Sequence, residues 1–501
     1  MDNSLRVVVI GSGFAGLSAA TSLAQLGYNV TLVEKNSVPG GRARRFHTDS
    51  GFVFDMGPSW YWMPDVFEQY FQRFGKSVSD YFNLIRLDPS YRVVFGENDN
   101  MDIPASMDEL RELFESYEAG SGKQLDAFLE QSAYKYEVGI NNLVYKPSRS
   151  VLEFTNPKLL FDMVRMDVFQ SFYKHVRKYF SNEKLLQLVE FPILFLGAIP
   201  QNTPALYSLM NYADMSLGTW YPEGGMFKIV EAMVDLAKEQ GVELVLDAEV
   251  NHIEVDGGVA KRVHTAKGTF EADIVVAGAD YHHVDAQLLD PKYRNYSEKY
   301  WDNRTMAPGS LLFYLGVNKK LDNLLHHNLF FDKDFGPHAH EIYTDPKWPT
   351  EPLFYVSVTS KTDPTAAPEG HENVFLLMPV APGLEDTEEI REQYYNVIMD
   401  RLEHLTGQSI REHVVYKRSY AHRDFIGDYH AFKGNAYGLA NTLRQTAILK
   451  PGLKNKKVSN LYYTGQLTVP GPGVPPSLIS GQVIADEVAK EHKLFAPVAV
   501  N

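Results

Sequence analysis

The sequence contains no cysteine among its 501 residues. This absence excludes disulfide bonds, thiolate nucleophiles, cysteine-held metals and a cysteine-linked flavin. Long apolar runs are missing as well: the longest nearly continuous one, Phe191 to Pro200, falls far short of the roughly 20 residues that a membrane-spanning helix needs. An apolar run already starts at Leu5, so we expect no signal peptide. These absences predict a cytoplasmic protein that is soluble or attached to a membrane surface.

Basic residues are in deficit, because 48 Lys and Arg stand against 63 Asp and Glu and give a formal net charge of −15. A nucleic-acid partner usually requires a basic face, so none is expected. A local basic or apolar patch can still dock on lipid. Aromatic residues are plentiful at 13%, and the length corresponds to roughly three domains. Both features favour a large interior lined by rings.

The first motif is a glycine-rich turn between a predicted strand and a predicted helix. Leu5 to Ile10 is short, continuous and β-branched, which indicates a buried strand, and Asn29 to Val33 indicates a second strand. The glycines permit a tight bend, close approach of backbone amides to a pyrophosphate, and close packing of helix on strand. Glu34 ends the second strand, where a carboxylate can bond a ribose hydroxyl. The predicted cofactor-binding residues of this turn are Gly11, Ser12, Gly13, Phe14, Ala15 and Gly16.

A Gly-Gly pair soon after Glu34 favours FAD over NAD. Gly40 and Gly41 let the backbone pass near the diphosphate, and Arg42 adds a cation for it. The alternative interpretation makes Arg42 a solvated surface charge. The predicted cofactor-binding residues of this segment are Lys35, Gly40, Gly41, Arg42 and Ala43.

A loop rich in glycine and proline lies between a strand and a helix near the C-terminus, within Leu461 to Val488. This order aims backbone amides and a helix N-terminus at the ribityl chain or the C2 carbonyl of a flavin. Partial positive charge there stabilises the reduced, anionic flavin. The alternative is a proline-rich surface loop. The predicted cofactor-binding residues are Gly465, Gln466, Gly473, Val474 and Pro475.

Together these motifs resemble the bacterial-type carotenoid desaturases, phytoene desaturase in particular, within the large FAD family that includes amine oxidases. The resemblance covers nearly the whole chain. Two further motifs point more narrowly to carotenoid enzymes: Tyr221-Pro222-Glu223-Gly224-Gly225-Met226, and Asp363-Pro364 followed by Ala367-Pro368-Glu369-Gly370. The chain departs from many relatives at Gln466 and Val469, which leaves the particular carotenoid open. Phytoene, a hydroxylated carotenoid desaturated at its 3,4 position and a diapocarotenoid are the alternatives.

The resemblance implies further contacts at the cofactor. It implies that residues 57–59 pass the flavin, that the backbone of Val250 touches adenine, and that residues 278–279 end a strand near the pyrophosphate. The cofactor-binding residues added in this way are Gly57, Pro58, Ser59, Val250, Gly278 and Ala279. Trp60, Trp62 and Tyr221 are candidates for the lining of a substrate channel, with plain core packing as an equal alternative.

The expected architecture is an α/β fold whose FAD-binding, Rossmann-like domain is discontinuous. Its three segments are residues 1–90, 222–300 and 441–501. Residues 91–221 are expected to form a helical region that contacts substrate and membrane. Residues 301–440 contain strand-like runs and are expected to form a β-sheet domain that binds substrate.

The chemistry that the resemblance implies is removal of two hydrogens from adjacent carbons of a long polyene, with a hydride passing to flavin N5. Burial of the apolar chain then supplies most of the binding. No catalytic acid or base and no metal site is identified, and the pair His282-His283 is expected at a surface turn. A carotenoid isomerase, a flavin amine oxidase and a prenyl-binding protein without flavin, similar to Rab GDP-dissociation inhibitors, remain as alternatives. Oligomeric state is left open.

A mixture of basic and apolar residues within 107–220 suits an interfacial helix that draws substrate from a bilayer. An amphipathic core helix with a solvated face is the alternative. The residues of this mixture are Lys158, Leu159, Leu160, Phe161, Arg165, Phe169, Phe172, Lys174, Arg177 and Lys178.

Overall fold

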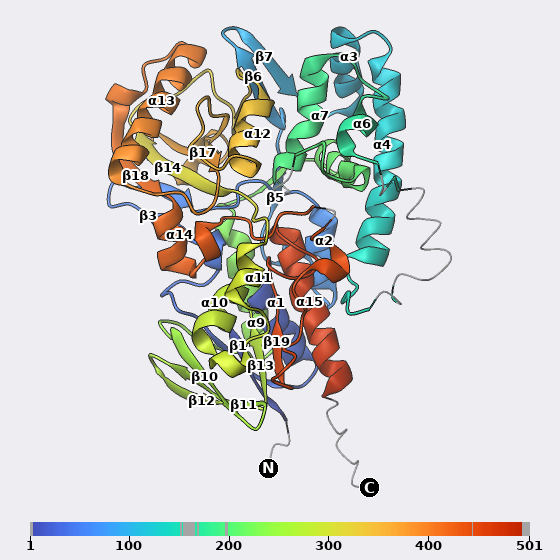
Figure 1. The fold of residues 1–501 in the computed structure, drawn as a ribbon. Coiled ribbons are helices and arrows are strands. Elements are labelled where there is room, and N and C mark those ends of the chain that lie inside the picture. Colours follow the sequence, from blue (N-terminus) through green and yellow to red (C-terminus); the bar gives the residue numbers. More distant parts are fainter. Residues whose placement is uncertain are drawn as a thin grey trace.

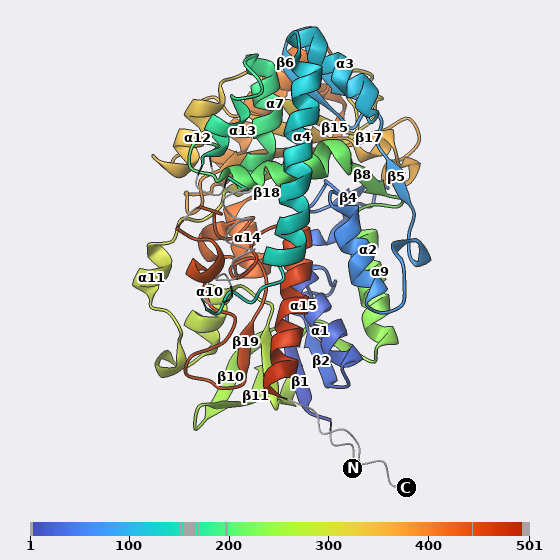
Figure 2. The ribbon, with the colours of Figure 1, turned by 90° about the vertical axis from the view of Figure 1, so that its right-hand side faces the viewer.

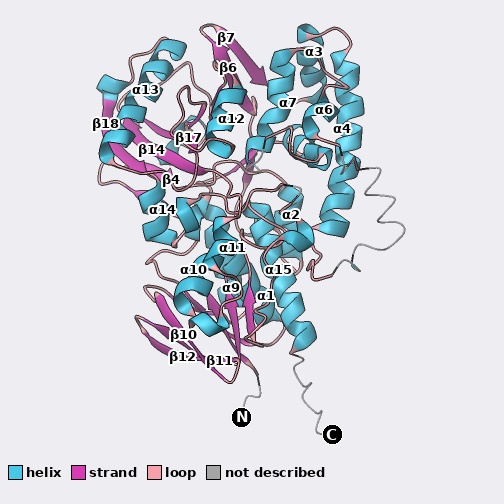
Figure 3. Cartoon of the chain, in the orientation of Figure 1, coloured by secondary structure: helices cyan, strands magenta, loops and turns pink. Residues whose placement is uncertain are grey.

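A computed structural model describes residues 4–150, 153, 166–167, 170–195, 199–442 and 444–492. A mostly parallel sheet with its helices forms one half of the molecule, and a second sheet with a cluster of helices forms the other (Figure 1, Figure 3). Among the described residues, no helix is both long and apolar enough to cross a membrane.

The first sheet has five parallel strands in the order β19-β13-β1-β2-β9. These strands are β1 (Arg6–Ile10), β2 (Asn29–Val33), β9 (Glu243–Val245), β13 (Ile274–Ala277) and β19 (Leu461–Tyr463). Strands from the beginning, the middle and the end of the chain thus lie side by side, and the two strands predicted around the first glycine motif are confirmed. A separate antiparallel sheet contains β10 (Val250–Asp256), β11 (Val259–Thr265) and β12 (Gly268–Glu271), with Gly257 and Gly258 at the turn between β10 and β11.

Three helices pack beside the parallel sheet: α1 (Phe14–Gln25), α9 (Phe227–Glu239) and α15 (Val474–Glu491). Helix α1 contacts both of the others, and Figure 2 shows α1 and α15 running next to each other. The contact is close because Gly481 of α15 has no side chain: a Cβ there would lie 2.4 Å from the Ala15 carbonyl oxygen. The first and last segments of the chain therefore meet through backbone rather than through large side chains.

The second sheet has seven strands in the order β18-β14-β17-β16-β15-β6-β7. Its members are β6 (Tyr91–Gly96), β7 (Asp99–Ile103), β14 (Gly309–Val317), β15 (His327–Phe330), β16 (Phe354–Ser357), β17 (Glu372–Val380) and β18 (Val414–Tyr420). Helix α13 (Glu388–Thr406) covers one face, where Leu311 and Phe313 pack against Ile398. The opposite face carries Leu312 and Tyr314, which belong to the large central core.

Residues 91–103 differ from the helical region expected over 91–221, because they form the hairpin β6–β7 and join the second sheet through a parallel pairing with β15. Tyr91 and Val93 face the core, as alternating strand residues do. Asn98 supplies the left-handed turn at φ 58°. Strand β15, with which β6 pairs, lies more than 200 residues further along the chain. No local pattern in the sequence could therefore predict this pairing.

The remaining helices and short strands connect these layers. The helices are α2 (Pro64–Gln72), α3 (Met107–Tyr117), α4 (Ser121–Val138), α6 (Phe172–Val176), α7 (Glu183–Phe195), α8 (Leu209–Asn211), α10 (Tyr281–His283), α11 (Glu298–Asp302), α12 (Phe335–Tyr343) and α14 (His422–Tyr429). Short strands pair as β3 (Arg45–His47) with β4 (Val53–Asp55) and as β5 (Leu84–Arg86) with β8 (Trp220–Pro222). Helices α3 and α4 follow residue 107, within the region expected to be helical.

The mixture of residues expected at a membrane is only partly within the described residues. Lys158, Leu159, Leu160, Phe161, Arg165 and Phe169 lie outside them. Of the described members, Phe172 is fully buried and Arg177 pairs with Glu190, whereas Lys174 and Lys178 are exposed. Membrane contact of this region stays a prediction.

Candidate functional site

One cavity lies between the two halves of the molecule, and it brings together nearly all of the predicted site residues. They come from segments that are hundreds of residues apart in the sequence. The predicted residues that line it are Gly11, Gly13, Phe14, Ala15, Glu34, Lys35, Gly40, Gly41, Arg42, Ala43, Gly57, Pro58, Ser59, Trp60, Trp62, Val250, Gly278, Ala279, Gly465, Gln466, Gly473, Val474 and Pro475. Ser12, Gly16 and Tyr221 do not line it.

The glycine-rich end of this cavity is built by close backbone contacts. A Cβ at Gly16 would lie 1.8 Å from the Gly11 carbonyl oxygen, and one at Gly278 would lie 3.1 Å from the Ile10 carbonyl oxygen. Gly13 is different, because a Cβ there would meet no atom within 4 Å and would project into open space in the cavity wall. Gly13 also caps α1, whose first turn receives no hydrogen bond from a capping side chain among the described residues. This end fits a dinucleotide, whose diphosphate needs bare backbone and a helix N-terminus.

Glu34 is buried and fully engaged by neighbouring groups. One carboxylate oxygen accepts hydrogen bonds from the backbone N–H and the hydroxyl of Ser12, at 2.8 and 2.7 Å. The other oxygen accepts from the backbone N–H and the side-chain amide of Asn36, at 2.9 and 3.0 Å. Ser12 thus holds the carboxylate in place instead of facing the cavity. A ribose hydroxyl would share Glu34 with the side-chain amide of Asn36, so this contact stays a prediction.

Arg42 is half-buried in the cavity wall, and its interpretation as a solvated surface charge is wrong. Burial lowers the pKa of its guanidinium, while the carboxylate of Asp280 opposes that effect. Arg42 forms no ion pair with any described residue, its Nε has no hydrogen-bond partner there, and its Nη2 donates a long bond of 3.4 Å to the Asn435 carbonyl. Its guanidinium lies 5.1 Å from the centroid of the Tyr429 ring. A half-buried cation in a cavity wall, with its Nε unsatisfied among the described residues, fits an anion such as a diphosphate.

Helix α14 supplies residues at this end that the sequence did not reveal. His430 follows α14 and stacks on His283, with ring centroids 3.8 Å apart and an angle of 5°. Its Nε2 lies 2.8 Å from a Glu249 carboxylate oxygen and 3.2 Å from Lys35 Nζ. Burial and the neighbouring His430 lower the pKa of His283 to about 3, so His283 is neutral.

His283 therefore lies in the wall of the cavity, and the expectation of a surface turn is wrong for it. His282 instead faces Glu298, with its Nε2 2.9 Å from a carboxylate oxygen. No sequence pattern links His283, Glu249 and His430, because three separate segments deliver them. Among the described residues, no group of three or more potential ligands could hold a metal.

The opposite end of the cavity is apolar, and one row of side chains across the second sheet forms part of its wall. Leu312 of β14 pairs with Leu377 of β17, which pairs with Tyr355 of β16. Trp60 stacks on His327 with centroids 4.1 Å apart, and Trp62 donates from Nε1 to Thr219 Oγ1 at 2.9 Å. Both tryptophans thus line the cavity and are also packed in the core.

Tyr221 and the two narrower motifs serve to join segments around the cavity. The Tyr221 hydroxyl donates to Asp363 at 3.1 Å, and the same carboxylate oxygen accepts from the Gly224 N–H at 3.1 Å. Asp55 accepts from the N–H groups of Met226 and Phe227 at the start of α9, at 2.8 and 3.1 Å. Burial raises the pKa of Asp55 to about 6. These motifs fix β4, β8 and α9 relative to one another, and the structure places Tyr221 away from the cavity.

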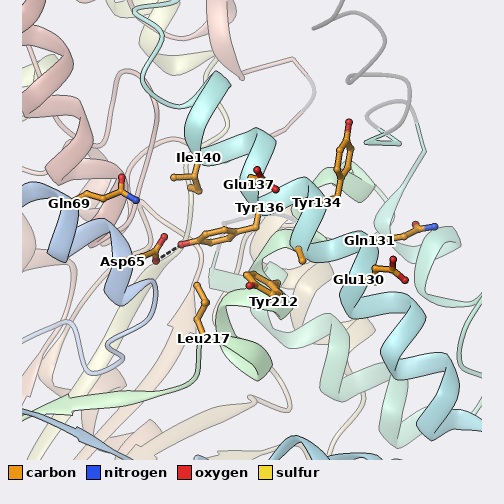
Figure 4. Close-up of a pocket in the computed structure, with 11 residues that line it drawn as sticks. Asp65, Gln69, Glu130, Gln131, Tyr134, Tyr136, Glu137, Ile140, Tyr212 and Leu217 are labelled. Carbon is orange, nitrogen blue, oxygen red and sulfur yellow. Dashed lines mark hydrogen bonds between the residues drawn. The ribbon is translucent and has the colours of Figure 1, made fainter.

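A second pocket lies on the other side of α2 (Figure 4). In this pocket the Tyr136 hydroxyl donates to Asp65 at 2.7 Å, and burial raises the pKa of Tyr136. Helix α2 presents Asp65 and Gln69 to this pocket and Phe67 to the first cavity. The helix therefore forms a partition between a polar and an apolar space.

Comparisons with known proteins agree with this geometry. The sequence profile of the family described as flavin containing amine oxidoreductase matches residues 14–489. The chain is 42% identical to a carotenoid 3,4-desaturase from Haloarcula japonica, over 97% of this chain and 98% of that protein. It is 31% identical to a zeta-carotene-forming phytoene desaturase from Myxococcus xanthus, over 96% and 93% of the two chains.

Two solved structures share the fold at low sequence identity. An oxidoreductase from Methanosarcina mazei superposes with a TM-score of 0.63 at 17% identity, over 96% of this chain and all of that one. Reduced UDP-galactopyranose mutase gives 0.60 at 15% identity, over 98% and 97%. At these identities the likeness concerns the architecture alone.

Proposed function

This chain belongs to the flavin containing amine oxidoreductase family, and from that premise we propose that it is an FAD-dependent carotenoid desaturase. One observation supports this proposal above the others: a single cavity joins a dinucleotide-shaped end to an apolar, ring-lined end. A flavin placed with its diphosphate at α1 would meet an apolar substrate inside the same cavity. Relatives that match over nearly their whole length are named as carotenoid desaturases.

FAD is the cofactor, and the chain offers groups for each part of it. The N-terminus of α1 and Arg42 would hold the diphosphate, and Glu34 would face the ribose. The loop that leads into α15 would face the flavin ring. When bound, FAD supplies an acceptor for two electrons, with N5 as the site that takes a hydride. Residues 1–90, 222–300 and 441–501 form the FAD-binding domain in this proposal.

The residues of the apolar end bind, orient and dehydrate the polyene. Burial of its carbon chain contributes roughly 25 cal/mol for each Å² of apolar surface. The reaction removes a hydride and a proton from adjacent carbons and leaves a new double bond between them. Trp60, Leu312 and Leu377 would hold those carbons against the flavin position and exclude water, which supplies rate through orientation.

The substrate resides in lipid, so the proposal includes attachment to a membrane surface, with the exposed Lys174 and Lys178 near α6 as the contact. Flotation with anionic liposomes tests this part. Reversing both charges should reduce the bound fraction, whereas reversing Lys267, exposed at the β11–β12 turn, should not. A wild-type protein that never floats with the liposomes would refute the attachment.

The decisive experiment combines flavin analysis with product analysis. The purified protein should be yellow and carry one FAD per chain. With liposomes containing a carotenoid and an electron acceptor, it should yield a product of longer conjugation, seen as a red-shifted absorption spectrum. A product of unchanged length but altered geometry would identify an isomerase, turnover of an amine alone would identify an amine oxidase, and a colourless protein that never takes up FAD would favour the prenyl-binding alternative.

A further inference from the structure

A buried lysine lies behind the flavin-facing loop, the segment of residues 464–473 that leads into α15. Lys450 is only 6% exposed, and its Nζ has no hydrogen-bond partner among the described residues. No carboxylate of those residues acts on its pKa. Burial of an unpaired ammonium group costs free energy, so this lysine needs an explanation other than stability.

A second buried polar group accompanies this lysine. Asn441 is 5% exposed, and its Oδ1 has no hydrogen-bond partner in the part of the chain that the structure describes. Both atoms lie beside Gly471 of the flavin-facing loop, where a Cβ would be 3.1 Å from Lys450 Nζ and 3.1 Å from Asn441 Oδ1. One donor and one acceptor without partners therefore meet the same point of the loop.

The flavin-facing loop separates these two groups from the cavity. Pro472, the residue after Gly471, lines the cavity together with Gly473 and Val474, whereas Lys450 stands behind this wall. A charge on the amine would therefore act on the flavin position through protein and not through bulk water. Charges interact more strongly across protein than across water, because protein screens them less.

The surroundings of Lys450 leave its amine close to the balance between its charged and neutral forms. Burial lowers the pKa of Lys450 to about 7, and no charged neighbour among the described residues changes it further. The titratable groups on the segments around it are Arg444, which is exposed, Tyr207 beside Thr446, and Tyr296, whose hydroxyl accepts from a backbone N–H at 3.0 Å. A modest change in the local field therefore decides whether the amine carries a proton.

We propose that Lys450 is a redox-linked proton acceptor, whose amine takes up a proton when the bound flavin is reduced and returns it on reoxidation. Transfer of a hydride into the cavity adds one negative charge to it, and a nearby negative charge favours the ammonium form of the amine. Uptake of one proton by Lys450 then keeps the net charge of the site unchanged. The Oδ1 of Asn441 favours the ammonium form as well, because that form has one more hydrogen to donate.

The atoms balance across the half-reaction. Two C–H bonds of the substrate break, and they yield one hydride and one proton while a C=C bond forms. The hydride carries both electrons to the flavin, and the formation of one N–H bond at Lys450 matches the proton that the substrate releases. The inference rests on the proposed function and adds to it the group that takes up the second hydrogen.

The test measures the midpoint potential of the flavin and needs no substrate. FAD-loaded wild type, Lys450→Met and Lys450→Arg are titrated against reference dyes at several values between pH 7 and 9.5. Uptake of a second proton for each two electrons doubles the slope of the potential against pH, and the wild type should show this doubled slope over part of the range. Lys450→Met should show the single slope throughout. At pH 7 and a given potential, its ratio of reduced to oxidised flavin should be about 10-fold lower than that of the wild type.

Lys450→Arg distinguishes proton uptake from a fixed positive charge. A guanidinium group stays protonated over this whole range of pH. The variant should therefore show the single slope, as Lys450→Met does, but a ratio of reduced to oxidised flavin at least as high as that of the wild type.

A matched control uses a lysine of the same segment. Lys454, four residues after Lys450, pairs with Glu491 and is partly exposed. Lys454→Met should therefore keep the doubled slope of the wild type. Flavin content is measured for every variant. If Lys450→Met fails to retain FAD, the wild-type slope alone decides, because a single slope from pH 7 to 9.5 overturns the proposal.

The outcomes for Lys450 and for the proposed function are distinct. A doubled slope that persists in Lys450→Met would assign the second proton to another group and overturn the role of Lys450, while the desaturase proposal would stand. A doubled slope that is lost in Lys450→Met supports the role of Lys450. Failure of the flavin-loaded wild type to lengthen the conjugation of any polyene would instead refute the proposed function.

Discussion

The two ends of the cavity are built in different ways. At the dinucleotide end, bare backbone forms the wall, and a Cβ at Gly16 would lie 1.8 Å from a carbonyl oxygen. At the apolar end, called the polyene end from here on, large side chains such as Trp62, just before α2, and Leu377 of β17 form the wall. Closely packed backbone atoms cannot move aside for an added side chain, whereas the side chains of an apolar wall can repack. Substitutions should therefore act abruptly at the first end and by degrees at the second.

The largest expected effect is that of Gly16→Ala. The added methyl group meets the Gly11 carbonyl, so the turn before α1 must open and the diphosphate site is lost. We expect no retained FAD, measured as the ratio of flavin to protein absorbance after gel filtration. Gly427→Ala on α14 is the control, because its Cβ would meet nothing within 4 Å and should leave flavin content unchanged. If Gly16→Ala retained a full complement of FAD, the contrast between the backbone wall and the side-chain wall of the cavity would be refuted.

The second effect concerns a charge behind the polyene end. Asp214 is buried and accepts hydrogen bonds from Tyr91 at 2.7 Å and from Thr219 at 3.3 Å, and Thr219 in turn accepts from Trp62. Burial raises its pKa from 3.8 to about 7. Because the folded pKa lies above the unfolded one, ionisation opposes folding. Its contribution to the free energy of unfolding therefore falls as pH rises from about 4 to 7, by on the order of 4 kcal/mol, and is constant above that.

Asp214→Asn should abolish this part of the pH dependence. The free energy of unfolding is measured by urea titration at several values between pH 4.5 and 8. The slope of this free energy against pH is compared between the proteins, and not its absolute value, since the amide also changes the hydrogen bonds. Asp49→Asn, on an exposed turn, should keep the wild-type slope. Parallel profiles for wild type and Asp214→Asn would show that Asp214 is ionised throughout.

Much of the dinucleotide end could be predicted because its signals are local. The strand before Gly11, the helix after it and the strand that ends at Glu34 are contiguous in sequence, and each follows its own periodicity. The burial of Arg42 was not predictable, since Tyr429 and Asn435, which enclose it, come from almost 400 residues further along.

The polyene end shows the same limit more strongly. Trp60 and Trp62 could be named as candidates, but their neighbours Leu312, Leu377 and Tyr355 become a wall only through strand pairing. Ser310 is one serine among many in the sequence, and only the fold shows that it lies in the cavity wall. Tyr221 shows the converse, because the motif that contains it is strong and yet joins segments instead of lining the site.

The third effect separates binding from stability at the dinucleotide end. Arg42→Met removes a half-buried cation that lacks an ion-pair partner among the described residues, so FAD affinity should fall about 30- to 100-fold. The apoprotein should become more stable by about 1 kcal/mol, because the buried charge is gone. FAD titration measures the expected fall in affinity, and thermal unfolding of the apoprotein measures the expected gain in stability. Arg44→Met is the contrast: it removes the partner of Asp428 and should destabilise the apoprotein. If Arg42→Met also destabilises it, then Arg42 serves packing more than the cofactor.

The smallest expected effect tests whether the two ends are independent. Trp62→Phe keeps a ring in the wall and removes the bond from Nε1 to Thr219, so kcat/KM for the polyene should fall about 3- to 10-fold. FAD affinity should not change, because Trp62 lies at the polyene end of the cavity wall. Because Trp62→Phe alone should leave FAD affinity unchanged, the double variant of Arg42→Met and Trp62→Phe should bind FAD as weakly as Arg42→Met alone, as expected for uncoupled sites. A coupled loss in the double variant would mean that the backbone wall and the side-chain wall respond as one unit, and the division of the cavity into an abrupt end and a graded end would have to be abandoned.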